Sequence, residues 1–414
     1  MTPLIKETEL FLDDKPAIYG LRQNSRAILK KTGFPTHKTE AWKYTDISPI
    51  IKNDFILNKT IEEECHCCTH STTDDSYISV KFCNGSLHVE EFNTPEGLTI
   101  TPLPIYLFED DYKPYLFKSF DIEKHPFAAL NGIYIEQGLF IHIEENIKIE
   151  KPIKIIYNQT HSENNQIHLH NVIVMEKNSE LDLFEQFNSE TNNKYLFNIV
   201  NEFYLKSDAI LHHYKIQKES RNAYHIALNS AKLQNNSKYL QYYLANGSKI
   251  CRNETLVNLD KKDAEAKVFS AYIAKKDCVN DITTNINHNC PQTYSNQYAK
   301  AVLEGKSTAT FQGKIHIARD AIQTTGYQLH KALYLENDAQ LNCKPELEIY
   351  ADDVKCSHGA TCGEVDKEQM FYLLSRGINK KDALNMLIKA HLEEVIDNLP
   401  NSKIKEIFLS CLND

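Results

Sequence analysis

The stretch NSELDLFEQF (residues 178–187) joins a short polar turn to a run in which apolar and polar residues alternate. Period-two alternation is typical of a β-strand with one buried face, because successive side chains point to opposite faces. Similar segments include GLFIHIEENIKI, FNIVNEFYLK, SKYLQYYLA and KVFSAYIAK, and they fill the chain from about residue 130 to about residue 350. Helix signals are nearly absent there, so the sequence predicts a mainly β region.

The turn and strand also repeat as a unit. Further copies are SDAILH (207–212), NNSKYL (235–240), KDAEAK (262–267), GKSTAT (305–310) and NDAQLN (337–342). Most copies are separated by about 26 to 32 residues, which is the length of a coil of two or three short strands. The sequence therefore predicts a parallel β-helix, or solenoid. An antiparallel sandwich would alternate in the same way, but it gives no reason for a repeat of this length.

One interval, between KDAEAK and GKSTAT, is wider than the others. A loop insertion would explain it, and we interpret HNCPQTYSNQ (288–297) as an excursion from the stack. A solenoid also has an open end that needs a cap with an apolar inner face. We expect the C-terminal segment to be that cap.

Helix signals frame the β region on both sides. AIYGLRQNSRAILKKTG (17–33) has apolar residues at helical spacing and Gly33 as its stop. In VDKEQMFYLLSRGI (365–378), Asp366 is a good N-cap, Gln369 completes a capping box and Gly377 ends a helix. Two more amphipathic helices follow, one after Asn379 and one around Ile404 to Leu412.

The expected organisation has three parts. They are an N-terminal helical and irregular region (1–100), a parallel β-helix core (101–355) and a C-terminal helical domain (356–414).

Composition excludes several classes of function. The chain has 414 residues and a formal net charge of −10, so it has no general attraction for nucleic acid or anionic membranes. No stretch is apolar and long enough to cross a bilayer. Eleven cysteines without an export signal indicate thiols in a reducing cytoplasm. We find no phosphate-binding loop, nucleophile elbow or zinc-protease motif, so we expect a protein that is not an enzyme.

Two segments carry candidate ligands. CHCCTH (65–70) offers Cys65, Cys67 and Cys68 as metal ligands, although such a crowded run is also typical of a thiol-rich loop. In VKCSHGATCGE (354–364), Cys356 and His358 would share one face of an extended strand. Thiolate and imidazole both bind iron. The alternative is a turn into the next helix, with Cys356 buried and His358 bonded to backbone.

DDVKCSHGATCGEVDKEQMFYLLSRGI (352–378) closely resembles the C-terminal signature of the SufD family of iron-sulfur cluster assembly proteins. KTEAWKYTDI (38–47), which holds the only tryptophan, is similar to that family's N-terminal motif. The resemblance implies a right-handed parallel β-helix, flanked by an N-terminal helical region and a C-terminal helical domain. It also implies two partners, the paralogous scaffold SufB and the ABC-type ATPase SufC. Cys362 departs from the family's pattern.

The resemblance assigns roles to residues. His358, with Cys356 beside it, is implied as an iron or cluster ligand at the interface with SufB, so this chain would supply a half site. Phe371, Tyr372, Arg376 and Gly377 are implied at the surface where SufC docks. The expected protein is a noncatalytic cytoplasmic scaffold that binds no cofactor stably alone and holds iron or a cluster transiently with SufB.

Three further expectations follow. The isolated chain forms a homodimer through the surface that SufB would cover. One alternative function is that of the principal, SufB-type cluster scaffold. The other, from a different class, is a β-helix polysaccharide lyase, although enzymes of that kind are usually exported.

Overall fold

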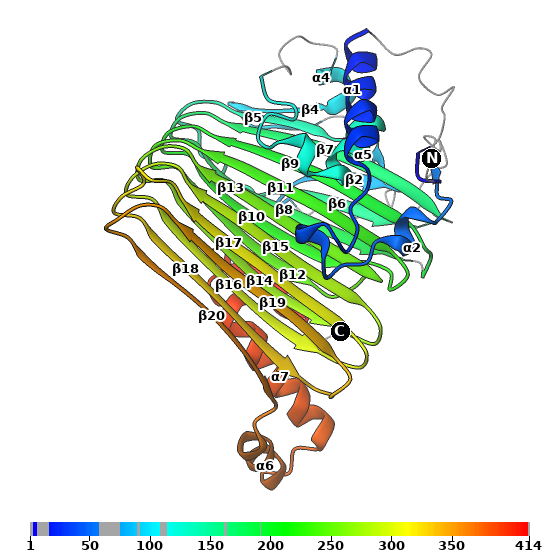
Figure 1. Cartoon of the computed structure of the whole chain (residues 1–414), viewed down its shortest axis with the longest axis vertical. Coiled ribbons are helices and arrows are strands. Elements are labelled where there is room, and N and C mark those ends of the chain that lie inside the picture. Colours follow the sequence, from blue (N-terminus) through cyan, green and yellow to red (C-terminus); the bar gives the residue numbers. More distant parts are fainter. Residues whose placement is uncertain are drawn as a thin grey trace.

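A computed structural model describes residues 3–5, 16–57, 75–88, 92–107, 114–160, 164–190 and 192–412. These residues form a solenoid of two facing β-sheets, with helices from both ends of the chain packed on its outside (Figure 1). Each coil gives one strand to each sheet, and strands of successive coils pair in parallel. The predicted parallel solenoid is therefore confirmed, and the antiparallel sandwich is excluded.

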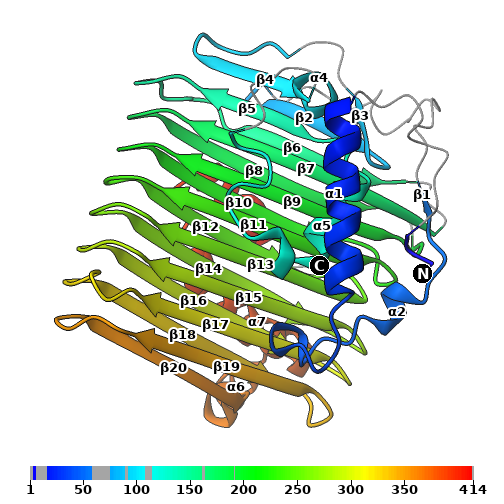
Figure 2. The same ribbon diagram turned by 45° about the horizontal axis from the view of Figure 1, so that its top comes forward.

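The first sheet has the order β19-β17-β15-β13-β11-β9-β7-β5-β4, and the second has the order β20-β18-β16-β14-β12-β10-β8-β6-β2-β3 (Figure 2). In the first sheet the strands are β4 (Leu98–Pro102), β5 (Leu139–Ile143), β7 (Asn165–Met175), β9 (Leu196–Leu205), β11 (Tyr224–Leu233), β13 (Ile250–Leu259), β15 (Val279–His288), β17 (Thr308–Ile317) and β19 (Gln340–Ile349). A short strand, β1 (Ile56–Leu57), adds to β7. In the second sheet they are β2 (Ile78–Cys83), β3 (Ser86–His88), β6 (Ile153–Gln159), β8 (Glu180–Ser189), β10 (Ile210–Lys218), β12 (Lys238–Ala245), β14 (Glu265–Ala274), β16 (Tyr294–Leu303), β18 (Thr325–Tyr334) and β20 (Lys355–Glu364).

The repeated turn has a simple backbone explanation. Five of the six copies place one residue in the left-handed region, for example Asn178 at φ 55° and Asp208 at φ 63°; the copy at 337–342 does not. Asn, Asp and Gly tolerate that conformation better than other residues. The turn chemistry thus marks where one strand ends and the next begins.

The interpretation of 288–297 as an excursion is wrong. These residues are the end of β15, a tight turn and the start of β16. The turn escaped the pattern because its left-handed residue is Gln292, at φ 60°. The earlier motifs lead into the second sheet, whereas GKSTAT and NDAQLN lead into β17 and β19 of the first. The wide interval is one and a half coils, so no insertion is needed.

The N-terminal segment covers the first sheet. α1 (Pro16–Thr32) ends where expected, with Gly33 at φ 70° and its N–H donating to the Leu29 carbonyl. It packs with α5 (Pro126–Ile133), which lies on β7 and β9. Other short helices in the described ranges are η2 (Glu40–Trp42), α2 (Ser48–Ile51), α4 (Leu103–Tyr106) and η4 (Ile122–Lys124). β2, β3 and most of β4 lie within the first hundred residues, so strands begin earlier than the expected core.

The first C-terminal helix has the predicted N-cap at Asp366 and the predicted stop at Gly377. The C-terminal helices are α6 (Lys367–Ser375), α7 (Lys380–Ile396) and α8 (Ser402–Ser410). The Asp366 carboxylate accepts hydrogen bonds from the backbone N–H groups of Glu368 and Gln369. After α6, the N–H of Gly377 donates to the Leu374 carbonyl and that of Ile378 to the Leu373 carbonyl, which is a Schellman motif.

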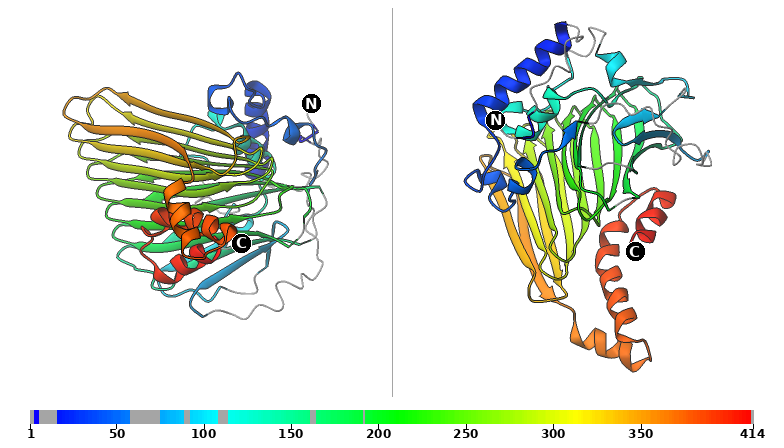
Figure 3. Two further views of the ribbon diagram at one scale, coloured as in Figure 1. Left: turned by 90° about the horizontal axis from the view of Figure 1, so that it is seen from below. Right: turned by 90° about the vertical axis from the view of Figure 1, so that its right-hand side faces the viewer.

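These helices do not cap the open end, and that prediction is wrong. α7 and α8 fold back along the outer face of the second sheet (Figure 3). Leu392, Val395, Ile396, Ile404 and Phe408 pack there against Tyr214, Tyr242 and Phe269. Because those aromatic side chains point outward from the sheet, the apolar stripe of the helices covers them instead. β19 and β20 remain as the end strands of the two sheets.

Candidate functional site

The segment VKCSHGATCGE lies on β20, the end strand of the second sheet. It pairs in parallel with β18, and this pairing places His358 beside Gln328 and Cys356 beside Gly326. The chain stays extended until Glu364 and turns into α6 only afterwards. The alternative, in which this segment is a turn into the next helix, is therefore wrong, and the solenoid continues past residue 355.

Cys356 and His358 face the inside of the solenoid. The Cys356 side chain is half-buried and packs against Ile315, Ile317 and Ala321. This burial raises the pKa of the Cys356 thiol. His358 lies two residues further along the same strand, so its side chain points to the same face. It is exposed, because β20 is the last strand of its sheet.

Two more thiols lie at this end. Cys362 shares the inner face of β20 with His358 and stands beside Ala332. Cys343, on β19, is half-buried, and burial together with the nearby Cys362 raises its pKa to about 11. Both are free thiols. The last coil therefore presents a sulfur-rich inner face toward the open end.

The expected ligands form at most a half site. In the part of the chain that the structure describes, no group of three His, Cys, Asp or Glu side chains is arranged to hold a metal ion. The other candidate set, Cys65, Cys67 and Cys68, lies outside the described residues. Cys356 and His358 together offer one sulfur and one nitrogen donor, which leaves most of a metal's coordination positions for other groups.

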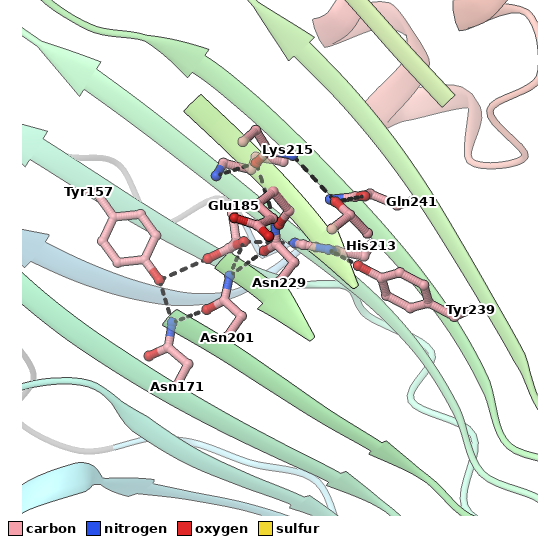
Figure 4. A network of polar contacts seen from close by, with 12 residues as sticks. Tyr157, Asn171, Glu185, Asn201, His213, Lys215, Asn229, Tyr239 and Gln241 are labelled. Atoms are coloured by element: carbon pink, nitrogen blue, oxygen red, sulfur yellow. Dashed lines mark hydrogen bonds and ion pairs between the residues drawn. The ribbon is translucent and has the colours of Figure 1, made fainter. Parts of the chain in front are cut away.

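A row of buried polar side chains runs through the middle of the solenoid (Figure 4). Asn171 donates to Asn201 over 2.9 Å, Asn201 to Asn229 over 2.9 Å and Asn229 to Asn253 over 3.2 Å. These residues come from β7, β9, β11 and β13, one from each coil. Stacked amides of this kind satisfy one another and fix the register of the coils.

Charged groups accompany this row. Glu185 lies 2.7 Å from His213, and Lys215 lies 3.0 Å from the Asn253 amide oxygen. Burial alone would raise the pKa of Glu185, but its hydrogen bond to His213 and the charges of His213 and Lys215 lower it overall. Burial lowers the pKa of Lys215. The sequence analysis did not predict this network. The pattern that could have indicated it is the recurrence of Asn, Gln and His at alternate positions of the strands.

The candidate docking residues lie on or just after α6, which extends away from the solenoid (Figure 3). Phe371 is 72% exposed and Tyr372 is 56% exposed. The guanidinium of Arg376 lies 5.2 Å from the centre of the Tyr372 ring. Gly377, at φ 84°, supplies the left-handed residue of the Schellman motif. Phe371 and Tyr372 thus form an uncovered apolar surface, whereas Gly377 has a structural role.

The motif KTEAWKYTDI is a strap across the outer face of the first sheet. Trp42 is buried, and the Arg252 guanidinium lies 4.1 Å from the centre of its ring. Arg252 is itself paired with Asp281, which also accepts a hydrogen bond from Thr45. Glu40 forms an ion pair with Lys344 on β19. The strap therefore links β13, β15 and the final coil.

Comparison with known proteins shows the family of the chain. The model for the SUF system FeS cluster assembly SufBD core domain matches residues 157–391, and the model for the SufBD N-terminal region matches residues 5–155. The chain belongs to the SufBD family.

Individual relatives cover nearly the whole chain. The iron-sulfur cluster assembly protein SufD of Escherichia coli is 28% identical, with 92% of this chain and 89% of that protein aligned. A SufBD family protein of Synechocystis is 27% identical over 95% of this chain and 90% of its own length. The chloroplastic protein ABCI7 of Arabidopsis thaliana is 27% identical over 93% of this chain and 83% of its own length. Among the described helices, none combines the length and apolarity needed to span a membrane.

Proposed function

We propose that this SufD-like chain is a noncatalytic scaffold subunit of an iron-sulfur cluster assembly complex. The observation that carries the proposal is the inner face of β20, the end strand of the second sheet, which brings Cys356 and His358 to the same side of one strand. Iron and sulfide are the cargo of this site. The chain acts as a transient holder in the cytoplasm and keeps no cofactor stably when alone.

SufB is the proposed partner at the open end. An end strand presents unpaired backbone N–H and C=O groups, and a partner strand satisfies them by continuing the sheet. A second solenoid that docks on β19 and β20 would cover the half-buried Cys343 and Cys356 and add its own ligands beside His358. The isolated chain uses the same surface to form a homodimer.

SufC is the proposed partner of α6. Support comes from Phe371 and Tyr372, which are exposed on a helix with well-formed caps. ATP hydrolysis by SufC would move the C-terminal helices, and α7 transmits that movement because it packs on β14 and β16. Substitution Phe371→Glu should lower retention of SufC and leave the solenoid folded. Equal retention would argue against docking at this helix.

The deciding experiment is the iron and acid-labile sulfide content of the complex purified with its SufB and SufC. His358→Ala should leave assembly of the three subunits intact and lower cluster content severalfold. His37→Ala, an exposed histidine of the N-terminal segment, is the matched control. Equal cluster content in wild type and His358→Ala would refute the ligand role. Robust cluster binding by the isolated chain would favour a principal, SufB-type scaffold instead.

A further inference from the structure

Gln328, on β18, is a buried amide without a partner. Its side chain is 2% exposed, and neither its amide oxygen nor its nitrogen has a hydrogen-bond partner in the part of the chain that the structure describes. Leaving a buried amide unpaired destabilises a fold. A leucine of similar size would avoid that cost. The glutamine therefore calls for an explanation other than packing.

The fold leaves room for this amide. A Cβ atom added to Gly313, on the facing strand β17, would lie 1.5 Å from Gln328 Nε2 and 2.7 Å from its Cδ. Any other residue at 313 would displace the Gln328 side chain. The glycine thus lets the amide reach across the middle of the solenoid.

The position of Gln328 distinguishes it from the glutamine one coil earlier. Gln297, Gln328 and His358 are register neighbours on β16, β18 and β20. Gln297 is satisfied, because it accepts a hydrogen bond from Thr284 and its amide nitrogen donates to the Lys314 carbonyl. Gln328, by contrast, lies beside His358 of the next strand, and its amide oxygen and nitrogen have no hydrogen-bond partner among the described residues.

The spacing suits a shared metal ion. Neighbouring strands lie about 4.8 Å apart. Two donors bound to one ion at about 2.1 Å each are separated by at most about 4.2 Å, which is close to the spacing of the two strands that carry Gln328 and His358. Cys356 lies two residues before His358 on the same face, beside Gly326. Cys356, His358 and Gln328 thus bring sulfur, nitrogen and amide oxygen to the inner faces of the last two strands of the second sheet.

We propose that the Gln328 amide oxygen is the third donor of an iron-loading site, with Cys356 Sγ and the His358 imidazole. The site takes a divalent transition-metal ion, ferrous iron as cargo, and the Cys356 thiol releases one proton to solvent when the Fe–S bond forms. The exposed side of His358 leaves coordination positions open for sulfide or for partner ligands. This inference rests on the proposed function, since it names how the same site receives iron.

The test is anaerobic Co²⁺ binding by the isolated chain, followed by thiolate-to-cobalt charge-transfer absorbance. A background with Cys65→Ser, Cys67→Ser, Cys68→Ser and Cys362→Ser removes the thiols of CHCCTH and the exposed thiol nearest to His358 on β20. Gln328→Leu should weaken Co²⁺ binding about tenfold, whereas Gln328→Glu, which keeps an oxygen donor, should bind at least as tightly as wild type. Gln297→Leu is the matched control and should bind as wild type does.

Folding is checked in the same samples. Gln328→Leu should melt at the same temperature as wild type or higher, because it removes an unpaired buried amide. Cobalt binding by Gln328→Leu equal to that of wild type, or no binding by wild type, would overturn the proposal. In either case, a loss of cluster from the His358→Ala complex would still support the proposed function. An unchanged His358→Ala complex would refute that function separately.

Discussion

At the scale of single residues, the N-terminal motif acts through packing. Trp42 lies on the Arg252 guanidinium, and Arg252 is fully buried between Asp281 and the tryptophan ring. The sequence showed that Trp42 was unusual but not why, because its partner is more than two hundred residues away. The motif therefore has a structural role: it holds the N-terminal segment on the outer face of the first sheet.

Trp42→Ala should destabilise the chain by about 3–5 kcal/mol, since it empties a buried aromatic site and exposes the Arg252–Asp281 pair. Urea unfolding measures this change. Tyr19→Ala is the control, because Tyr19 is 50% exposed, and it should change stability by about 0.5 kcal/mol or less. Similar urea midpoints for the two variants would show that the strap contributes little to the stability of the fold.

Glu254 makes this region sensitive to acid. Burial alone would raise its pKa, but the charges of His125 and Arg252 and their hydrogen bonds lower it from 4.5 to about 2. A carboxyl with a lowered folded-state pKa stabilises the fold above its unfolded pKa, and this contribution disappears as pH falls from about 4.5 to about 2. The free energy of unfolding of wild type should exceed that of Glu254→Gln by on the order of 2–3 kcal/mol near neutral pH. This difference in stability should shrink as the pH is lowered from about 4.5 to about 2. A constant difference would contradict the assignment.

At the scale of elements, the sequence identified the strands and their turns because alternation and left-handed residues are local features. It did not show which sheet each strand joins, so the change of sheet before β17 was missed. The C-terminal helices illustrate the same limit. Their apolar stripes and caps are local, whereas the aromatic face of the second sheet that they cover is assembled from distant strands.

One glycine in a left-handed turn and one in a helix test whether the turns require a left-handed residue. Gly305 sits in the turn before β17 at φ 67°, where a Cβ atom would lie 3.0 Å from Lys276 Cα. Gly305→Ala should therefore destabilise the chain by about 1–2 kcal/mol. Gly20 lies within α1 with open space around it, so Gly20→Ala should stabilise by up to about 1 kcal/mol. Thermal unfolding of the two variants should show shifts of opposite sign, and shifts of the same sign would contradict the argument.

At the scale of the whole molecule, the site depends on stacking of coils. The shared face of Cys356 and His358 follows from their spacing and was predictable. The contribution of Gln328 was not, because it lies thirty positions earlier and meets His358 only through the register of β18 and β20. The open end itself was predicted to be covered. It is uncovered because α7 and α8 pack on the outer face of the second sheet instead.

If the inner face of β20 meets the partner, adjacent residues of this strand should differ sharply in their effect. Ala360 shares the inner face with His358, and Thr361 points to the opposite face; both are exposed in the single chain. Ala360→Glu would place a carboxylate in the interface, where burial without a partner is costly. It should abolish co-purification with SufB and self-association measured by sedimentation. Thr361→Glu should preserve both, and each variant should unfold within about 0.5 kcal/mol of wild type. Equal assembly by the two variants would place the partner on another surface.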